Sequence, residues 1–462
     1  MNKVLSSSKY NTLVYLGSRF HAEFWIICLI VSLGLFQSIS LGFYQFRLVD
    51  AVLILSAFYA IPMFVKRRVN RKIRWLLSIY IIVTFLRIFF EYDPSAGIQS
   101  LKTLFGMSAA YLAPFIYFVV RESRVSRRIL IRLLALGCGI ALLSQLGLLT
   151  MGESSVGGIV NLGKILHIPS LKLGTSILGY QERTITVWRA LSVGLTFALL
   201  LSNTKPWIKV VGVGMFFLQF AGGSGTRSTF IFIFLVPVIL FWWRGSHRIS
   251  KRFKRILQYG IIALIFVSVY LWSPFGGEYA KSSESPDTKT HYERVTEVLV
   301  ALPGGGPVPT STSFLNARLY VWDQYWRTIL SNPKILLFGT GLANVDAWKW
   351  IGANKGLAHN MFLDAWGVTG LVNLLFIIIF LIFIFSDLKN LLSLPLVDTI
   401  SQILVFSYAT AVLYFLQYLM VQAVVLDRSY MIVFYLTAGI LKPLANLLKV
   451  GLQLRNGNVQ HI

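Results

Sequence analysis

Charged residues are scarce in this chain: they occupy 13% of its 462 positions, whereas hydrophobic residues occupy 56%. With a mean hydropathy of +0.68, this composition excludes a soluble globular protein of this size. Apolar stretches recur along the whole chain, and each is long enough to cross ~30 Å of hydrocarbon as a helix. We therefore expect an all-α polytopic membrane protein with about 12 transmembrane helices. The predicted spans lie near residues 23–41, 48–65, 75–90, 104–120, 129–149, 186–201, 207–221, 229–243, 256–273, 365–386, 399–425 and 429–446.

Cysteine is also nearly absent. The two cysteines, Cys28 and Cys138, both fall inside predicted spans, which excludes a disulfide framework and a cysteine-based metal site. The chain lacks an Asp-x-Asp pair, a Walker-type glycine loop and an HExxH motif. We therefore expect neither ATP-driven work nor metal-dependent group transfer, and no cofactor.

Basic residues crowd three connections between predicted spans, at residues 66–74, 121–132 and 244–255. With twelve spans, all three clusters fall on one side of the membrane together with both termini. The positive-inside rule places that side in the cytoplasm. The formal net charge of +25 therefore reflects topology signals, or contacts with anionic membrane lipids, and not binding to nucleic acid.

The spans divide the chain into three regions. Residues 1–273 form predicted helices 1–9, residues 274–364 form a large exoplasmic loop, and residues 365–462 form helices 10–12 and a cytoplasmic tail. Loops of that length are usually functional or disordered. A second exoplasmic loop, near residues 150–185, has no assigned role.

The large loop contains one segment with helical periodicity, in which apolar residues recur at steps of four, three, four and three. These residues are Leu315, Leu319, Trp322, Trp326 and Ile329. The spacing predicts an amphipathic helix that suits the bilayer interface and stops at Asn332-Pro333. Residues 338–342 then predict a tight turn, because glycines stand at positions 339 and 341.

Three arginines on the exoplasmic side are candidates for binding a lipid phosphate. Arg227 lies in a glycine-rich connection, where backbone N–H groups and a guanidinium fork could hold an anion; the alternative is a tight turn with a snorkelling arginine. Arg318 points partly toward the aromatic face of the amphipathic helix, so it is either a ligand or an interfacial anchor. Arg189 lies slightly inside an apolar run, and its partner is a lipid phosphate, Glu182 or a neighbouring helix.

Among the exoplasmic histidines His167, His291 and His359, the last has the most informative position. It is followed by Asn360, a good helix cap, and by the tenth predicted span. A helix N-terminus at the membrane edge would hold the ring beside a phosphate site and favour its neutral, basic form. The alternative is an ordinary surface histidine.

These features occur in an order that resembles a known family. The landmarks are the large loop between spans nine and ten, Gly-Thr-Arg-Ser at 225–228, Arg318 followed by Trp322, Phe338-Gly-Thr-Gly341, and His359-Asn360 running into Gly367-Val-Thr-Gly370. Together, over about residues 222–375, they resemble the O-antigen ligase and O-antigen or exopolysaccharide polymerase family of bacterial inner membranes.

The resemblance implies a metal-independent, inverting glycosyltransferase with its active site in the periplasm. It would move glycan from an undecaprenyl-diphosphate carrier to a sugar hydroxyl, with a chain-length regulator as a further partner. Arg227 and Arg318 would hold the diphosphate and His359 would act as general base. Arg189 is a further candidate for the diphosphate, and Trp322 and Trp326 are candidates for stacking on sugars.

Two alternatives stay open. The motifs do not separate a polymerase from a ligase that transfers glycan to lipid A–core, although the exoplasmic aromatics favour a polymerase slightly. A glycan-lipid flippase or secondary transporter also has about twelve spans, but such proteins place ionisable residues near the bilayer midplane. Here the candidates lie near the exoplasmic edge.

Overall fold

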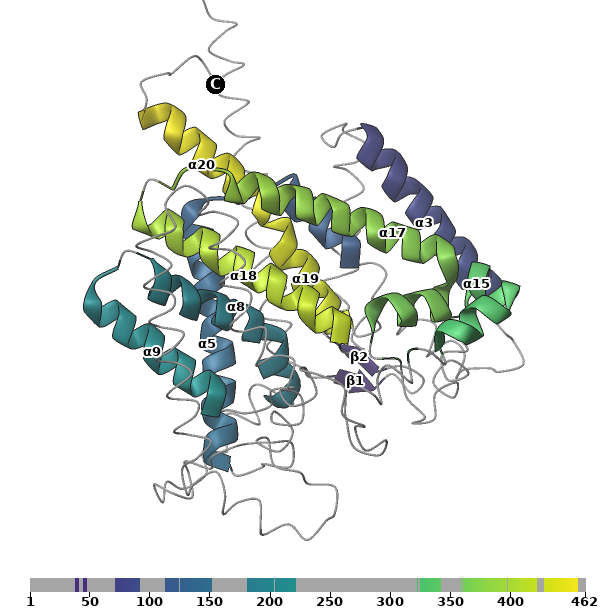
Figure 1. The fold of residues 1–462 in the computed structure, drawn as a ribbon, viewed down its shortest axis with the longest axis horizontal. Helices are drawn as coiled ribbons and strands as arrows, with labels where there is room; N and C mark the ends of the chain where they lie inside the picture. The colour runs from purple at the N-terminus through teal and green to yellow at the C-terminus, as the bar shows by residue number, and fades with distance from the viewer. Residues whose placement is uncertain are drawn as a thin grey trace, which may run out of the picture.

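The computed structural model describes residues 38–40, 45–47, 71–91, 113–123, 125–151, 181–202, 204–221, 322, 325–341, 358, 360–396, 398–421 and 428–455. Nearly all of these residues are helical (Figure 1). The strands among them are β1 (Ser38–Ser40) and β2 (Gln45–Arg47), an antiparallel pair in which Ile39 lies opposite Phe46. Residues 38–40 were expected to end the first span, so that part of the prediction is wrong: β-branched and aromatic residues in cross-strand positions favour the extended chain here.

The helices of the first half match the predicted spans in position. They are α3 (Arg71–Glu91), a helix at residues 113–121, α5 (Arg127–Met151), α8 (Gln181–Leu201) and α9 (Pro206–Ala221). The predicted spans near 48–65, 229–243 and 256–273 lie outside the described residues.

Toward the C-terminus the described chain is also helical. The elements are a helix at residues 325–331, α15 (Pro333–Phe338), α17 (Met361–Leu392), α18 (Thr399–Val421), α19 (Arg428–Gly439) and α20 (Leu441–Arg455). Three stretches of the described chain are long and apolar enough to cross a membrane: Met361–Leu392, Thr399–Leu419 and Tyr430–Leu452. The protein is thus helical with membrane-spanning character, and the count of twelve spans stays a prediction.

The last predicted span, 429–446, is divided between α19 and α20 at Ile440. Pro443 lies in the first turn of α20, where its missing N–H removes a bond that a continuous helix would need. Gly439 also allows close packing, since a Cβ there would lie 2.9 Å from the carbonyl oxygen of Tyr117. The junction therefore sits against the helix at residues 113–121.

Helix α8 packs extensively against α18 and α5. At the α18 contact a small residue permits backbone approach: a Cβ on Gly194 would lie 2.2 Å from the carbonyl oxygen of Ser407. Small residues at such crossings are typical of helix packing in membranes, where van der Waals contact is the main attraction. On the α5 side, Gly137 makes room for the fully buried ring of Trp188.

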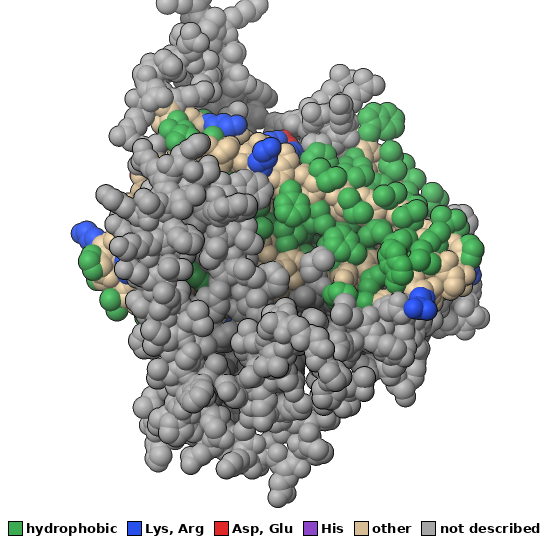
Figure 2. Space-filling model, viewed as in Figure 1, with side chains coloured by type: hydrophobic (Ala, Val, Ile, Leu, Met, Phe, Trp, Pro, Cys, Tyr) green, Lys and Arg blue, Asp and Glu red, His purple; other side chains and the backbone are tan. Residues whose placement is uncertain are grey.

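An apolar surface covers the side of the molecule formed by α17, α3 and α15 (Figure 2). Its exposed hydrophobic residues recur along one face of α3 and one face of α17. They are Trp75, Ile79, Ile82 and Leu86 on α3, and Val372, Leu375, Ile378, Ile382 and Phe385 on α17. A continuous exposed patch of this kind suits contact with lipid tails and is unusual for a soluble monomer.

Candidate site at the start of α17

Helix α17 consists of two parts that meet at Gly370. This glycine has φ 76° and ψ 180°, a backbone conformation that L-residues with a side chain rarely adopt. We call residues 361–369 the short arm and residues 371–392 the long arm. Figure 1 shows the short arm turning back beside α15. The bend leaves the last carbonyl groups of the short arm without helical partners.

Those carbonyl groups are satisfied by the turn that follows α15. The N–H of Thr340 donates to the oxygen of Gly367 at 2.7 Å, and the N–H of Gly341 donates to the oxygen of Val368 at 2.9 Å. Backbone contact this close requires a glycine at position 339, where φ is 73° and a Cβ would lie 2.4 Å from the Val368 oxygen. The tight turn predicted around residue 339 is therefore confirmed, and its role is to hold the bend.

The aromatic segment before α15 ends as predicted at Asn332-Pro333. The Asn332 side chain accepts hydrogen bonds from the backbone N–H groups of Lys334 and Ile335, and Pro333 occupies the first turn of α15. Helix α15 is tied to the short arm by Trp366, whose Nε1 donates to the oxygen of Leu336 at 2.9 Å.

The short arm begins with Asn360, as predicted for a helix cap. Its Oδ1 accepts from the N–H of Phe362 at 3.0 Å and of Leu363 at 3.3 Å.

One turn further on, Asp364 is fully buried, and its two carboxylate oxygens face back along the chain. Oδ1 accepts from the N–H of Ala358 at 2.8 Å and Oδ2 from the N–H of Asn360 at 3.3 Å. The residues on either side of position 359 are thus held by one side chain.

A second side chain holds the same stretch from the aromatic segment. Trp322 Nε1 donates to the carbonyl oxygen of Ala358 at 2.7 Å, across 36 residues of sequence. The segment that contains Arg318 and Trp322 is therefore joined to the segment that contains His359, although Arg318 and His359 themselves lie outside the described residues. So does Arg227.

The other predicted site residues occupy different surroundings. Arg189 is only 4% exposed on α8, the helix that packs against α18 and α5. Trp322 is partly buried and packs against the core, whereas Trp326 is 44% exposed. The Trp326 ring meets Trp366 edge to face, with centroids 5.4 Å apart. Trp326 is therefore the more exposed of the two side chains, while the indole N–H of Trp322 already donates to Ala358.

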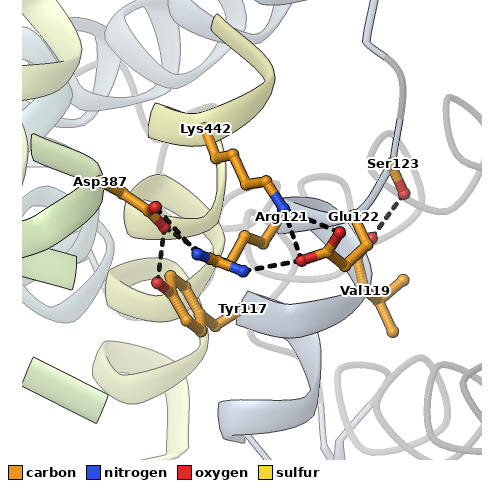
Figure 3. Close-up of polar contacts among 7 residues, drawn as sticks. All are labelled: Tyr117, Val119, Arg121, Glu122, Ser123, Asp387 and Lys442. Carbon is orange, nitrogen blue, oxygen red and sulfur yellow. Dashed lines mark hydrogen bonds and ion pairs between the residues drawn. The ribbon is translucent and has the colours of Figure 1, made fainter. Parts of the chain in front are cut away.

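A cluster of charged residues lies at the opposite end of α17 (Figure 3). Arg121 donates two hydrogen bonds to Asp387, from Nε to Oδ2 at 2.6 Å and from Nη2 to Oδ1 at 3.0 Å. Tyr117 donates its hydroxyl to the same carboxylate at 2.8 Å. Glu122 accepts from Arg121 Nη1 and from Lys442 Nζ, both at 2.7 Å. These five residues, the charge cluster, connect the helix at 113–121, α17 and α20.

Neither Asp364 nor the charge cluster was predicted as a functional feature from the sequence. A carboxylate in the first turn of a helix can accept a hydrogen bond from the backbone N–H of the cap residue, and the position of Asp364 could have suggested such a reciprocal cap. Its bond to Ala358 depends on the path of the chain before the helix, which the spacing does not show. Arg121 lies 266 residues from Asp387, and Glu122 lies 320 residues from Lys442, so these partners cannot be paired from spacing. Within the described part of the chain, no group of three or more His, Cys, Asp or Glu side chains could hold a metal ion.

Comparison with known proteins assigns no family to this chain. No family model matches it. The NAD(P)H-quinone oxidoreductase subunit L of Prochlorococcus marinus is 35% identical over 46 residues, which are 10% of this chain and 60% of that protein. The chain thus spans less than two thirds of that protein's length, and a match over a tenth of this chain shows no shared family.

Proposed function

We propose that this protein is a membrane glycosyltransferase that acts at the periplasmic face of the bacterial inner membrane, with both termini in the cytoplasm. It takes glycan from an undecaprenyl-diphosphate carrier and adds it to a sugar hydroxyl, most simply to extend O-antigen or exopolysaccharide chains. The observation that carries the proposal is the bond from Trp322 to Ala358. It joins the segment of a candidate diphosphate ligand, Arg318, to that of the candidate base, His359.

The proposed reaction needs one proton acceptor and stabilisation of one leaving group. His359 accepts the proton of the acceptor hydroxyl as its oxygen attacks the anomeric carbon. The bond from that carbon to the diphosphate oxygen breaks, and its electron pair leaves with the lipid diphosphate. The configuration at the anomeric carbon inverts. The imidazolium then releases its proton to water, which restores the base.

The role proposed for the arginines is to stabilise the negative charge that develops on the leaving diphosphate. Arg227 and Arg318 supply guanidinium forks that match phosphate oxygens and need no metal. Arg189 is buried at 4% exposure, a placement that would suit a contact within the membrane boundary. The exposed side chain of Trp326 suits stacking on a sugar of the growing chain.

The test is transfer by the purified full-length protein in lipid nanodiscs, given undecaprenyl-diphosphate oligosaccharide as donor. We expect chain extension that persists with a chelator. His359→Ala should lower the turnover by about 10²–10⁴-fold, the usual contribution of a general base. Arg227→Ala and Arg318→Ala should each cost about 2–4 kcal/mol of transition-state stabilisation.

The controls separate the alternatives. His167→Ala and His291→Ala should behave as the parent protein, and Arg318→Lys should recover little activity because a point charge lacks the bidentate fork. Transfer to lipid A–core without chain extension would identify a ligase. Movement of the intact donor across the bilayer with no transfer would identify a flippase and end the proposal.

A further inference from the structure

We propose that Asp364 is a positioning residue for this reaction: its carboxylate holds the backbone on both sides of position 359 and so fixes the approach of the base. The inference rests on the proposed function, and it adds a residue to which no role was assigned from sequence. Asp364 need not touch the reacting atoms to act in this way.

The short arm of α17 does not need Asp364 as a cap. The side chain of Asn360 already accepts from the N–H groups of Phe362 and Leu363. A reciprocal cap would add one bond, from the backbone N–H of the cap residue to a carboxylate in the first turn. Asp364 makes that bond to Asn360 at 3.3 Å, yet its shorter bond, 2.8 Å, goes to the N–H of Ala358.

The burial of Asp364 also points to a positioning role. The Asp364 side chain is 0% exposed, and a carboxylate removed from water is unfavourable unless its oxygens are satisfied. Each of its oxygens accepts a backbone N–H from the two residues that flank position 359. The buried carboxylate thus holds the backbone N–H groups of both Ala358 and Asn360.

Ala358 is also held by a second side chain, from the aromatic segment before α15. Trp322 donates to the carbonyl oxygen of Ala358 at 2.7 Å, so both polar backbone atoms of Ala358 are engaged. Behind it, the short arm is fixed by Trp366 and by the glycine turn at residues 339–341. A misplacement of about 1 Å at a reacting group can lower a rate by about 100-fold. Loss of these hydrogen bonds should therefore lower the rate by up to that factor.

The test compares Asp364→Asn with Asp398→Asn in the full-length protein in nanodiscs. Asp398 is the control: its carboxylate also accepts a backbone N–H, that of Ser401 at 2.8 Å, but it lies before the start of α18 and not inside a helix. We expect Asp364→Asn to lower kcat by about 10–100-fold with the donor KM changed by less than about threefold. Asp398→Asn should leave both constants unchanged.

A second variant and a second measurement guard against simple loss of folding. Trp322→Phe keeps the ring but removes the N–H donor, and it should lower kcat in the same direction. Hydrogen exchange of the Ala358 and Asn360 amides should speed up in Asp364→Asn and not in Asp398→Asn. If Asp364→Asn keeps the parent kcat at equal folded protein, the inference is wrong while the proposed function stands. If the parent protein transfers no glycan, the function and the positioning role fail together, and the exchange rates alone show whether the tether exists.

Discussion

Each end of α17 buries an aspartate, but the two carboxylates have different partners. Asp387 is 3% exposed and is held by the Arg121 guanidinium and the Tyr117 hydroxyl, from a helix far away in sequence. Asp364 is 0% exposed and accepts from backbone N–H groups within six residues of itself. The first arrangement joins helices, whereas the second fixes the shape of a short stretch of chain. The same residue type on one helix thus serves assembly at one end and local geometry at the other.

The largest effect should follow from breaking the charge cluster. Asp387→Ala leaves the Arg121 guanidinium, which is 11% exposed, without its bidentate partner, and removing one member of a buried pair typically costs about 3–5 kcal/mol. We expect the free energy of unfolding in mixed micelles to fall by that amount. Transfer activity per folded molecule should stay unchanged.

The control for that prediction removes both charges. Arg121→Met combined with Asp387→Leu should recover much of the lost stability, because two well-packed apolar residues leave no uncompensated charge. Reduced activity per folded molecule in Asp387→Ala would mean that the two ends of α17 are coupled.

The next effect should follow from changing the bend itself. Gly370→Ala places a Cβ 2.3 Å from the Leu337 oxygen at a backbone conformation reserved for glycine, which should cost about 1–3 kcal/mol or more. Because the short arm must move, this variant should lose stability and transfer activity together. Gly139→Ala in α5 is the matched control, since its Cβ would meet nothing within 4 Å. Alanine there should stabilise slightly, by up to about 1 kcal/mol.

The smallest effect on stability should follow from substituting Asp398. Its side chain is 47% exposed and pairs with Arg127. Partial burial alone would raise the pKa of the Asp398 carboxyl, but hydrogen bonds from Ser401 and the charge of Arg127 outweigh it and lower the pKa below its ordinary value of 3.8. Its contribution is therefore present above that pH and disappears as the pH falls through the lowered pKa.

We expect Asp398→Asn to cost about 0.2–1 kcal/mol at neutral pH, the range for an exposed ion pair, because asparagine keeps an oxygen that can cap α18. The difference between parent and variant should shrink as the pH falls below 3.8 and through the lowered pKa of Asp398. Thermal unfolding of both proteins as a function of pH measures it. A difference that grows toward acid would contradict the assignment of the lowered pKa.

Much of the fold described here could be predicted from the sequence, because its signals are local. Apolar runs gave the positions of α3, α5, α8, α9, α17 and α18. The stop at Asn332-Pro333, the turn at Gly339 and the cap at Asn360 also follow from residue type, since each uses a side chain or backbone freedom within a few residues.

What the sequence could not predict depends on contacts between distant segments. A glycine within an apolar helix is ordinarily tolerated, so the bend at Gly370 becomes evident only with the backbone of Leu337 against it. Trp322 has the spacing of an apolar helical face, and nothing local indicates that its indole N–H donates to Ala358. The pairing of Arg121 with Asp387 joins two helices that are far apart in sequence. Which helices lie side by side depends on the packing of all of them, and local sequence does not show it.

The straight part of α17 also has a length that matters. Between Gly370 and Asp387 the chain rises about 26 Å at 1.5 Å per residue, close to the ~30 Å of a bilayer's hydrocarbon layer. If the charge cluster lies at one boundary of the hydrocarbon layer, the bend at Gly370 would lie near the other. Each ångström of mismatch with the lipid costs a fraction of a kcal/mol, so the thickness of the membrane would then affect how deeply Ala358 and Asn360 lie. In lipids with longer or shorter acyl chains, the depth of the site would change before any of its contacts did.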